Sequence, residues 1–201
     1  MVMSESELIV RFGVRLEKSF FDEETCAKII AEMRRSRGGA ATVYGAGEPD
    51  SVDRRFRSAT RIIPSATTAT FVKERLWARR LKMEEHFRLS LCECEEPQFL
   101  RYAEGDFFVA HQDGNTGLLK LDSDRERRVS LIVFLNRQME EAMPGAYCGG
   151  SLVFSSYGGG PAERLSMSGE PGTLVAFRAE TTHEVKTVTG GERFTIACWY
   201  K

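Results

Sequence analysis

Histidine is scarce in this chain, which contains only His86, His111 and His183. His111 opens the tripeptide His111-Gln112-Asp113. Side chains two positions apart at the end of a strand point to the same side, so this tripeptide can present an imidazole and a carboxylate together. His183, 72 positions after His111, completes the set if its strand meets the first across a barrel. Two histidines and one carboxylate cover one face of an octahedral metal, and their nitrogen and oxygen atoms suit Fe(II).

Each of these residues also has an ordinary structural interpretation. Asp113-Gly114-Asn115 is a good turn sequence, so His111 and Asp113 could simply end a strand. His183 could be a partly buried histidine that bonds to the backbone. His86 lies off the apolar stripe of a predicted helix, which predicts a surface position outside any site.

Arg193 offers a second kind of chemistry, ten residues after His183. It opens the segment RFTIACWY, which predicts a mostly buried strand. A buried guanidinium needs an anion, and a carboxylate-bearing cosubstrate can supply one through a bidentate contact. The alternative is a surface arginine.

The elements that must position these residues change character after Pro97, where short strand-like segments replace helical periodicity. Eight strands are predicted, at residues 98–102, 107–111, 128–135, 150–155, 163–167, 173–177, 183–188 and 193–200. Strands at this spacing predict a double-stranded β-helix, or jelly roll.

The first 97 residues predict a support for this core. Residues 8–16 predict a strand, Asp22 caps a helix that ends at Gly38-Gly39, residues 59–63 predict a short strand, and residues 67–91 predict a helix. Residues 38–58 predict a long loop, which we expect to act as a substrate lid. The expected fold is one α+β domain over residues 1–201, with a strand and helical support over 1–97 and the jelly-roll core over 98–201.

Composition narrows the class of protein. With 28 Lys and Arg against 29 Asp and Glu, the net charge of −1 gives no general attraction to nucleic acid or an anionic membrane. The first residues show no secretory signal, and no apolar run is long enough to cross a bilayer. Five irregularly spaced cysteines predict reduced thiols and a cytoplasmic location. Nothing in the sequence predicts an oligomeric state.

Four arginines, Arg54, Arg55, Arg57 and Arg61, gather around the end of the 38–58 loop. They could bind an acidic or polar substrate, or they could be exposed charges that lead into a strand.

Residues 99–200 resemble the 2-oxoglutarate- and Fe(II)-dependent dioxygenases, in particular their prolyl 4-hydroxylase-like branch. The segments that carry the resemblance, in family order and spacing, are FLRY (99–102), GDFFVAHQD (105–113), RVSLIVFLN (128–136), GGSLVF (149–154), PGTLVAF (171–177), HEV (183–185) and GERFTIACWY (191–200). Phe20-Phe21-Asp22 and Cys26 match the family's lead-in more loosely.

The resemblance implies roles for five residues. His111, Asp113 and His183 would bind the catalytic Fe(II). Arg193 would pair with the distal carboxylate of 2-oxoglutarate, and the Tyr102 hydroxyl would support the same cosubstrate, although Tyr102 could equally be a core aromatic. The implied reaction uses O2 and couples decarboxylation of 2-oxoglutarate to succinate and CO2 with C–H hydroxylation, and it allows ascorbate as a reductant. Prolyl residues in a protein or peptide are the first expectation, and a free amino acid or small metabolite is the alternative.

Two residues discriminate among related classes. Asp113 argues against the related halogenases, which lack this carboxylate, and Trp199 stands where the nucleic-acid-demethylating branch carries a second arginine. Outside the family, the alternatives are a jelly-roll protein that binds metal or ligand without turnover and a zinc hydrolase with the same ligands. Arg193 counts against the hydrolase, which needs no cosubstrate.

Overall fold

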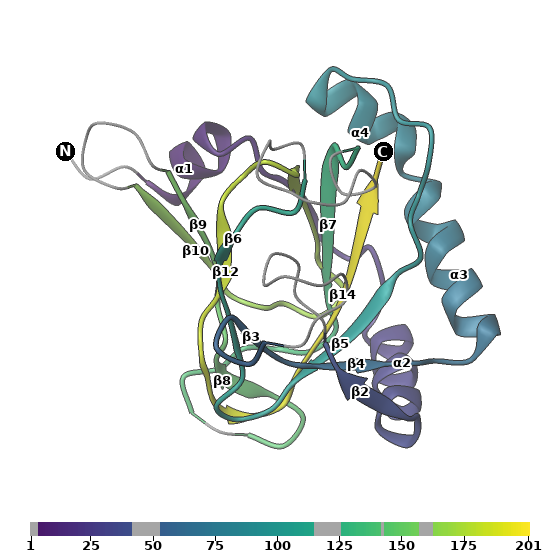
Figure 1. Ribbon diagram of the computed structural model, residues 1–201, viewed down its shortest axis with the longest axis vertical. Coiled ribbons are helices and arrows are strands. Elements are labelled where there is room, and N and C mark those ends of the chain that lie inside the picture. The colour runs from purple at the N-terminus through teal and green to yellow at the C-terminus, as the bar shows by residue number, and fades with distance from the viewer. Residues whose placement is uncertain (1–3, 42–52, 115–125, 142, 157–162) are drawn as a thin grey trace.

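Two antiparallel sheets face each other in the computed structural model, which describes residues 4–41, 53–114, 126–141, 143–156 and 163–201 (Figure 1). Within these ranges the larger sheet has the strand order β1 (Arg15–Glu17), β11 (Leu174–Arg178), β7 (Val129–Phe134), β14 (Arg193–Tyr200), β5 (Gln98–Tyr102), β4 (Thr60–Ile62) and β2 (Gly38–Ala40). The smaller sheet has the order β10 (Arg164–Met167), β9 (Leu152–Ser155), β12 (His183–Val185), β6 (Phe107–His111) and β3 (Arg57–Ser58). A separate ribbon pairs β13 (Val188–Gly191) with β8 (Tyr147–Gly149). This is the expected jelly roll.

Period-two alternation along β14 separates two cores. Phe194, Ile196 and Cys198 belong to the core that the helices cover, whereas Ala197 and Trp199 belong to a core between the two sheets. All eight residues of the strand are buried, because both of its faces are covered. The alternation therefore also directs the side chain of Arg193 into the space between the sheets.

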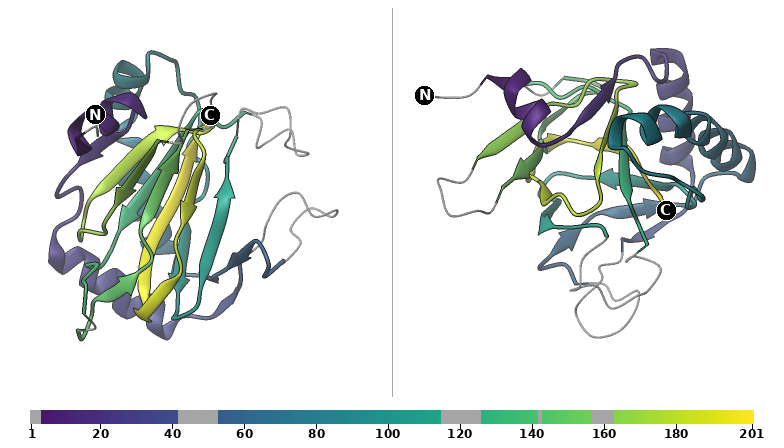
Figure 2. Two further views of the ribbon diagram at one scale, coloured as in Figure 1. Left: turned by 90° about the vertical axis from the view of Figure 1, so that its left-hand side faces the viewer. Right: turned by 90° about the horizontal axis from the view of Figure 1, so that it is seen from above.

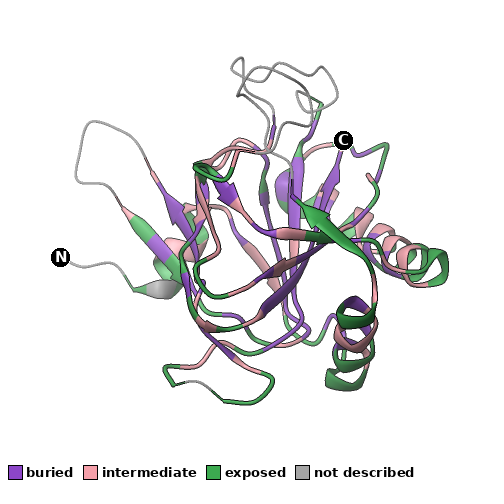
Figure 3. Cartoon of the chain, turned by 60° about the horizontal axis from the view of Figure 1, so that its bottom comes forward, coloured by how far each residue is buried: buried purple, intermediate pink, exposed green. Residues whose placement is uncertain are grey.

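Three helices cover the outer face of the larger sheet: α2 (Glu23–Arg35), α3 (Ala66–Trp77) and α4 (Arg80–Phe87). Figure 3 shows their outer sides exposed and the strands beneath them largely buried. The remaining helix, α1 (Glu5–Arg11), lies elsewhere, against β10 (Figure 2). None of the helices in the described ranges combines the length and apolarity needed to cross a bilayer.

The N-terminal support differs from its prediction in several places. The predicted strand over residues 8–16 is wrong: its first part is α1, and only Arg15–Glu17 form β1. A capping box explains this helix, since Ser4 accepts a hydrogen bond from the Glu7 backbone while the Glu7 carboxylate accepts one from the Ser4 backbone. The helix predicted over residues 67–91 is two helices, α3 and α4, which meet at Ala78 and Arg79.

The helix capped by Asp22 forms as predicted, but it ends at Arg35 rather than at the glycine pair. Gly38 and Gly39 instead begin β2, so the predicted loop over residues 38–58 starts with a strand and ends with β3. Its central part, residues 42–52, lies outside the described residues, and so does the lid prediction. The N-terminal half thus contributes strands to both sheets as well as helices.

Among the core strands, β5, β6 and β14 have the predicted bounds. The strand predicted over 183–188 is divided into β12 and β13, and β8 was not predicted. The strands β8 and β13 carry glycines, and the register of their pairing shifts between Val188 and Gly190. Such irregular, short strands carry little of the alternation on which the prediction depended.

Gly172 fixes the support to the core. Its backbone has φ +72°, and a Cβ there would lie 1.9 Å from the carbonyl oxygen of Phe21. We expect Gly172→Ala to lower the free energy of unfolding by at least about 2 kcal/mol, because strain and overlap with backbone add. A urea titration measures this. Gly39→Ala is the matched control, since a Cβ there meets nothing within 4 Å; equal stability of the two variants would contradict the expectation.

Candidate metal and cosubstrate site

His111 and His183 lie directly opposite each other on adjacent strands of the smaller sheet. The register pairs them across β6 and β12, so they meet side by side and not across the barrel. Asp113 follows β6 and is held by its backbone N–H, which donates to the Ala179 carbonyl at 2.9 Å. One ligand atom from each of these three residues lies within 4.8 Å of the others. The structure thus brings the three predicted ligands together.

Backbone contacts fix how the two imidazoles present their nitrogens. Nδ1 of His111 lies 2.8 Å from the Val109 carbonyl oxygen, and Nδ1 of His183 lies 2.9 Å from that of Thr181. Because a carbonyl can only accept, each Nδ1 carries a proton. The Nε2 atoms then face Asp113, at 3.4 Å for His111 and 3.5 Å for His183. This is the arrangement by which proteins orient neutral metal-binding histidines.

The ionisation states of these groups also fit a metal. His183 is 3% exposed, and burial with the neighbouring His111 lowers its pKa to about 4, so it is neutral at pH 7. Burial alone would raise the pKa of Asp113, but His183, His111 and Trp199 outweigh it and hold that pKa well below its ordinary range. One anionic oxygen ligand and two neutral nitrogen ligands are a donor set that Fe(II) accepts.

Ser130 on β7 supports Asp113 from the larger sheet. Its fully buried hydroxyl donates to Oδ2 of Asp113 at 2.7 Å. Trp199 on β14 brings its indole against the same carboxylate. Asp113 is therefore oriented from the larger sheet by Ser130, whose contribution sequence analysis missed.

Arg127 closes the site behind Trp199. It makes a bidentate ion pair with Glu95, at 2.8 and 2.7 Å, and its guanidinium lies 4.0 Å from the centre of the Trp199 ring. It also donates to the Asp113 carbonyl at 3.4 Å. These contacts bury Arg127, so it belongs to the wall of the site.

Ser130→Ala is expected to weaken Fe(II) binding by about tenfold, because hydrogen bonds that orient a metal ligand are typically worth 10–100-fold in affinity. An Fe(II) titration of 2-oxoglutarate turnover measures the effect, and turnover at saturating Fe(II) should change much less. Ser166→Ala, at an exposed position on β10, is the control. An unchanged iron requirement in Ser130→Ala would show that the Ser130 contact does not orient the ligand.

Arg193 is 1% exposed and lies between two aromatic rings, with its guanidinium 5.0 Å from the centre of Tyr102 and 5.4 Å from that of Phe134. Its Nη1 donates to the Thr195 hydroxyl at 3.2 Å, while its Nε has no partner among the described residues. No carboxylate of those residues lies within ion-pair distance of it. A buried cation without an anion is costly, so this geometry fits a cosubstrate carboxylate.

Tyr102 is the cross-strand partner of Arg193 and shares its face of the sheet. A second tyrosine, Tyr147 on β8, also adjoins Arg193 and was missed by sequence analysis. Its hydroxyl is buried without a hydrogen-bond partner in the described part of the chain. Burial raises the pKa of this hydroxyl more than the neighbouring Arg193 lowers it. Gly150 and Gly169 make room for this arrangement: a Cβ at Gly150 would lie 3.1 Å from Arg193 Cδ, and one at Gly169 only 2.1 Å from the Tyr147 hydroxyl. In the sequence, the glycine pair at 149–150 was the feature that could have indicated a role for Tyr147.

The remaining predicted residues lie elsewhere. His86 is exposed on α4, as predicted. The four clustered arginines separate: Arg55 pairs with Asp53, Arg61 is exposed, and Arg54 and Arg57 line a cavity at the edges of the two sheets.

A jelly roll that brings a partly buried His-X-Asp strand end together with a buried, distant histidine defines the class of protein: a jelly-roll protein with a candidate mononuclear metal site and a candidate anion site. The family model described as the 2OG-Fe(II) oxygenase superfamily matches residues 97–201. The chain belongs to this superfamily.

Individual relatives agree with this assignment. A PKHD-type hydroxylase of Burkholderia thailandensis is 36% identical over 105 residues, which are 51% of this chain and 41% of that protein. The chain thus matches less than half the length of this relative.

Solved structures share the fold. A prolyl 4-hydroxylase of Pseudomonas putida has a TM-score of 0.68 and 23% identity, with 97% of this chain and 95% of the other covered. A prolyl hydroxylase of Trichoplax adhaerens, solved with a peptide fragment of hypoxia inducible factor, has a TM-score of 0.65 and 16% identity, with 96% and 86% covered.

Proposed function

We propose that this protein is a 2-oxoglutarate- and O2-dependent hydroxylase in which His111, Asp113 and His183 hold Fe(II). The observation that carries the proposal is the convergence of these three residues within 4.8 Å, with both Nδ1 atoms engaged by backbone carbonyls. When bound, Fe(II), 2-oxoglutarate and O2 supply the oxidising chemistry, in which succinate and CO2 are formed and one oxygen atom enters a C–H bond of the substrate.

The protein's own residues would bind the metal and the cosubstrate, orient them and keep water out of the site. The two Nε2 atoms and the ionised Asp113 would hold the metal, and three protein ligands of this kind are the set that the proposed chemistry requires. Arg193 binds the distal carboxylate of 2-oxoglutarate through its planar fork. Tyr102 stacks on that guanidinium and faces the same space. Phe154 and Phe177 pack around His183 and keep its surroundings apolar.

The proposed substrate is a prolyl residue in a protein or peptide, and the alternative is a free amino acid or small metabolite. Support comes from the PKHD-type hydroxylase relative and from the shared fold of the prolyl hydroxylases, one of which was solved with a peptide. Ascorbate is proposed as an accessory reductant. We also propose a cytoplasmic location, which the five free cysteines support.

Succinate release tests the proposal. The protein, supplied with Fe(II), 2-oxoglutarate and O2, is screened against proline-containing peptides, free amino acids and small metabolites, and products are examined for one added oxygen atom. We expect succinate that depends on both iron and oxygen. Iron binding with no succinate under any condition would favour the metal- or ligand-binding protein, and activity with zinc alone would favour the hydrolase.

A further inference from the structure

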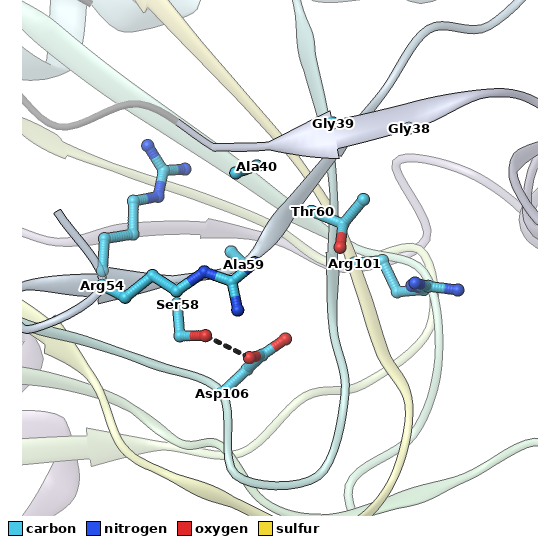
Figure 4. A pocket seen from close by; sticks show the side chains of 10 residues that line it. Gly38, Gly39, Ala40, Arg54, Ser58, Ala59, Thr60, Arg101 and Asp106 are labelled. Atoms are coloured by element: carbon cyan, nitrogen blue, oxygen red, sulfur yellow. Dashed lines mark hydrogen bonds between the residues drawn. The ribbon is translucent and has the colours of Figure 1, made fainter. Parts of the chain in front are cut away.

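A polar cavity of about 330 Å³ lies where β2 and β4 of the larger sheet approach β3 of the smaller sheet (Figure 4). Its lining includes Arg54 and Arg57, together with Ser58, Thr60 and Asp106. Arg101 also borders the cavity, but its charge is directed to Glu192, with which it pairs at 3.5 Å. Arg54 and Arg57 are two further cationic groups in the lining.

This cavity is connected to the metal site by one aromatic ring. The Arg57 guanidinium lies 4.6 Å from the centre of the Phe108 ring, and that ring stacks on His111 at 3.6 Å between centroids. Arg57 and Phe108 are also cross-strand partners on β3 and β6. A molecule bound to Arg57 in the cavity would thus be separated from a proposed iron ligand by the Phe108 ring.

Charge in the cavity favours an anion. Arg57 is 8% exposed, which is unusual for an arginine, and its stacking on Phe108 fixes the guanidinium. Asp106 is the acidic residue in the lining, but both of its oxygens are engaged: Oδ1 accepts from the Ser58 hydroxyl and Oδ2 from the Ala103 N–H at 2.9 Å. Arg54 is exposed, and Figure 4 shows its side chain reaching toward Ala40 across the cavity.

We propose that this cavity is a substrate subsite in which Arg54 and Arg57 bind a carboxylate of the molecule to be oxidised. Arginine forks match carboxylates in geometry as well as charge. The carboxylate can be an acidic side chain beside the target residue of a peptide or the α-carboxylate of a free amino acid. The inference rests on the proposed function only in assigning the bound molecule as the substrate.

Pairs of probes that differ in one charge test it. Proline peptides with Glu or Gln beside the proline, and proline with prolinamide, are titrated calorimetrically into the protein with Fe(II) and 2-oxoglutarate in the absence of oxygen. We expect the carboxylate member of at least one pair to bind about tenfold more tightly, the effect of one hydrogen bond to a charged group. Which pair shows the preference identifies the source of the carboxylate.

Two variants of Arg54 and one control make the test specific. The preference should fall to about threefold or less in Arg54→Gln, and Arg54→Glu should favour a lysine-containing peptide instead. Arg61→Gln, which removes an exposed arginine outside the cavity, should keep the preference. Equal binding within every pair, no binding of any carboxylate member, or a preference unchanged in Arg54→Gln overturns the inference.

Turnover separates this inference from the proposed function. If iron-dependent succinate is never formed but the charge preference in binding follows Arg54, the proposed function fails and the anion subsite stands. If succinate is formed but binding ignores charge, the subsite fails and the hydroxylase stands.

Discussion

His183→Ala is expected to abolish iron-dependent formation of succinate. In the proposed site the side chain supplies one of two nitrogen ligands, and its neighbour Phe177 cannot replace it. The loss should exceed the roughly 10–100-fold that is typical when a residue only orients a metal ligand. Succinate release over a range of Fe(II) concentrations measures it, and excess iron should not restore activity.

A metal-binding measurement separates this effect from unfolding. His183 is buried against Phe154, Phe177 and His111, so its truncation also leaves a cavity. His183→Gln retains most of the volume and should show the same loss of iron binding with a smaller loss of stability. His86→Ala is the matched control, since it removes the exposed histidine and should keep full activity. Unchanged succinate production in His183→Ala would reject the ligand assignment.

Packing on both faces made one strand, β14, especially clear in the sequence. β14 has apolar side chains toward the helices and a mixed set toward the other sheet, so its length was evident from composition alone. The short strands β2, β3 and β8 have two or three residues each and depend on distant partners. Their pairing is a tertiary property, and local sequence carries little trace of it.

The errors in predicting the helices from the sequence have a similar origin. Leu8, Ile9 and Val10 favour a strand by propensity, but the capping box at Ser4 and packing of Leu8 and Ile9 on the second core select a helix. The break between α3 and α4 coincides with tertiary contacts: Arg79 pairs with Glu17 at 2.6 Å, and the Tyr200 hydroxyl donates to the Leu76 carbonyl. Periodicity alone could not predict either outcome.

Site residues could be predicted where their spacing along the sequence brings them together. They could not be predicted where only the pairing of distant strands does so. His111 and Asp113 share one strand end, so their proximity followed from a two-residue interval. Ser130 and Tyr147 reach the site only because β7 and β8 lie beside it. Ser130 has no neighbouring residue that indicates a role, and near Tyr147 only the glycine pair at 149–150 does. Residues that orient ligands and cosubstrates from other strands therefore need the three-dimensional fold to be found.

Substitution of Arg193 is expected to have the second large effect on turnover. Arg193→Met should raise the 2-oxoglutarate concentration needed for half-maximal turnover by about 100-fold, because the lost contact is a buried pair of charges worth roughly 3 kcal/mol. Initial rates of succinate release over a range of 2-oxoglutarate concentrations measure this. Arg34→Met is the control: Arg34 also stacks on a ring of β14, at 5.2 Å from Phe194, but on the helix-covered face.

Stability in the absence of cosubstrate should change in the opposite direction. Arg193 is a buried cation that no carboxylate of the described residues neutralises, so an apolar side chain of similar length should leave the melting temperature of the ligand-free protein equal or higher. Saturating 2-oxoglutarate should stabilise the unaltered protein, by about 2.7 kcal/mol at 100 times its Kd, and should barely stabilise Arg193→Met. A residue with only a structural role would show the reverse: lower stability without ligand and an undiminished response to 2-oxoglutarate. That result would remove Arg193 from the cosubstrate site.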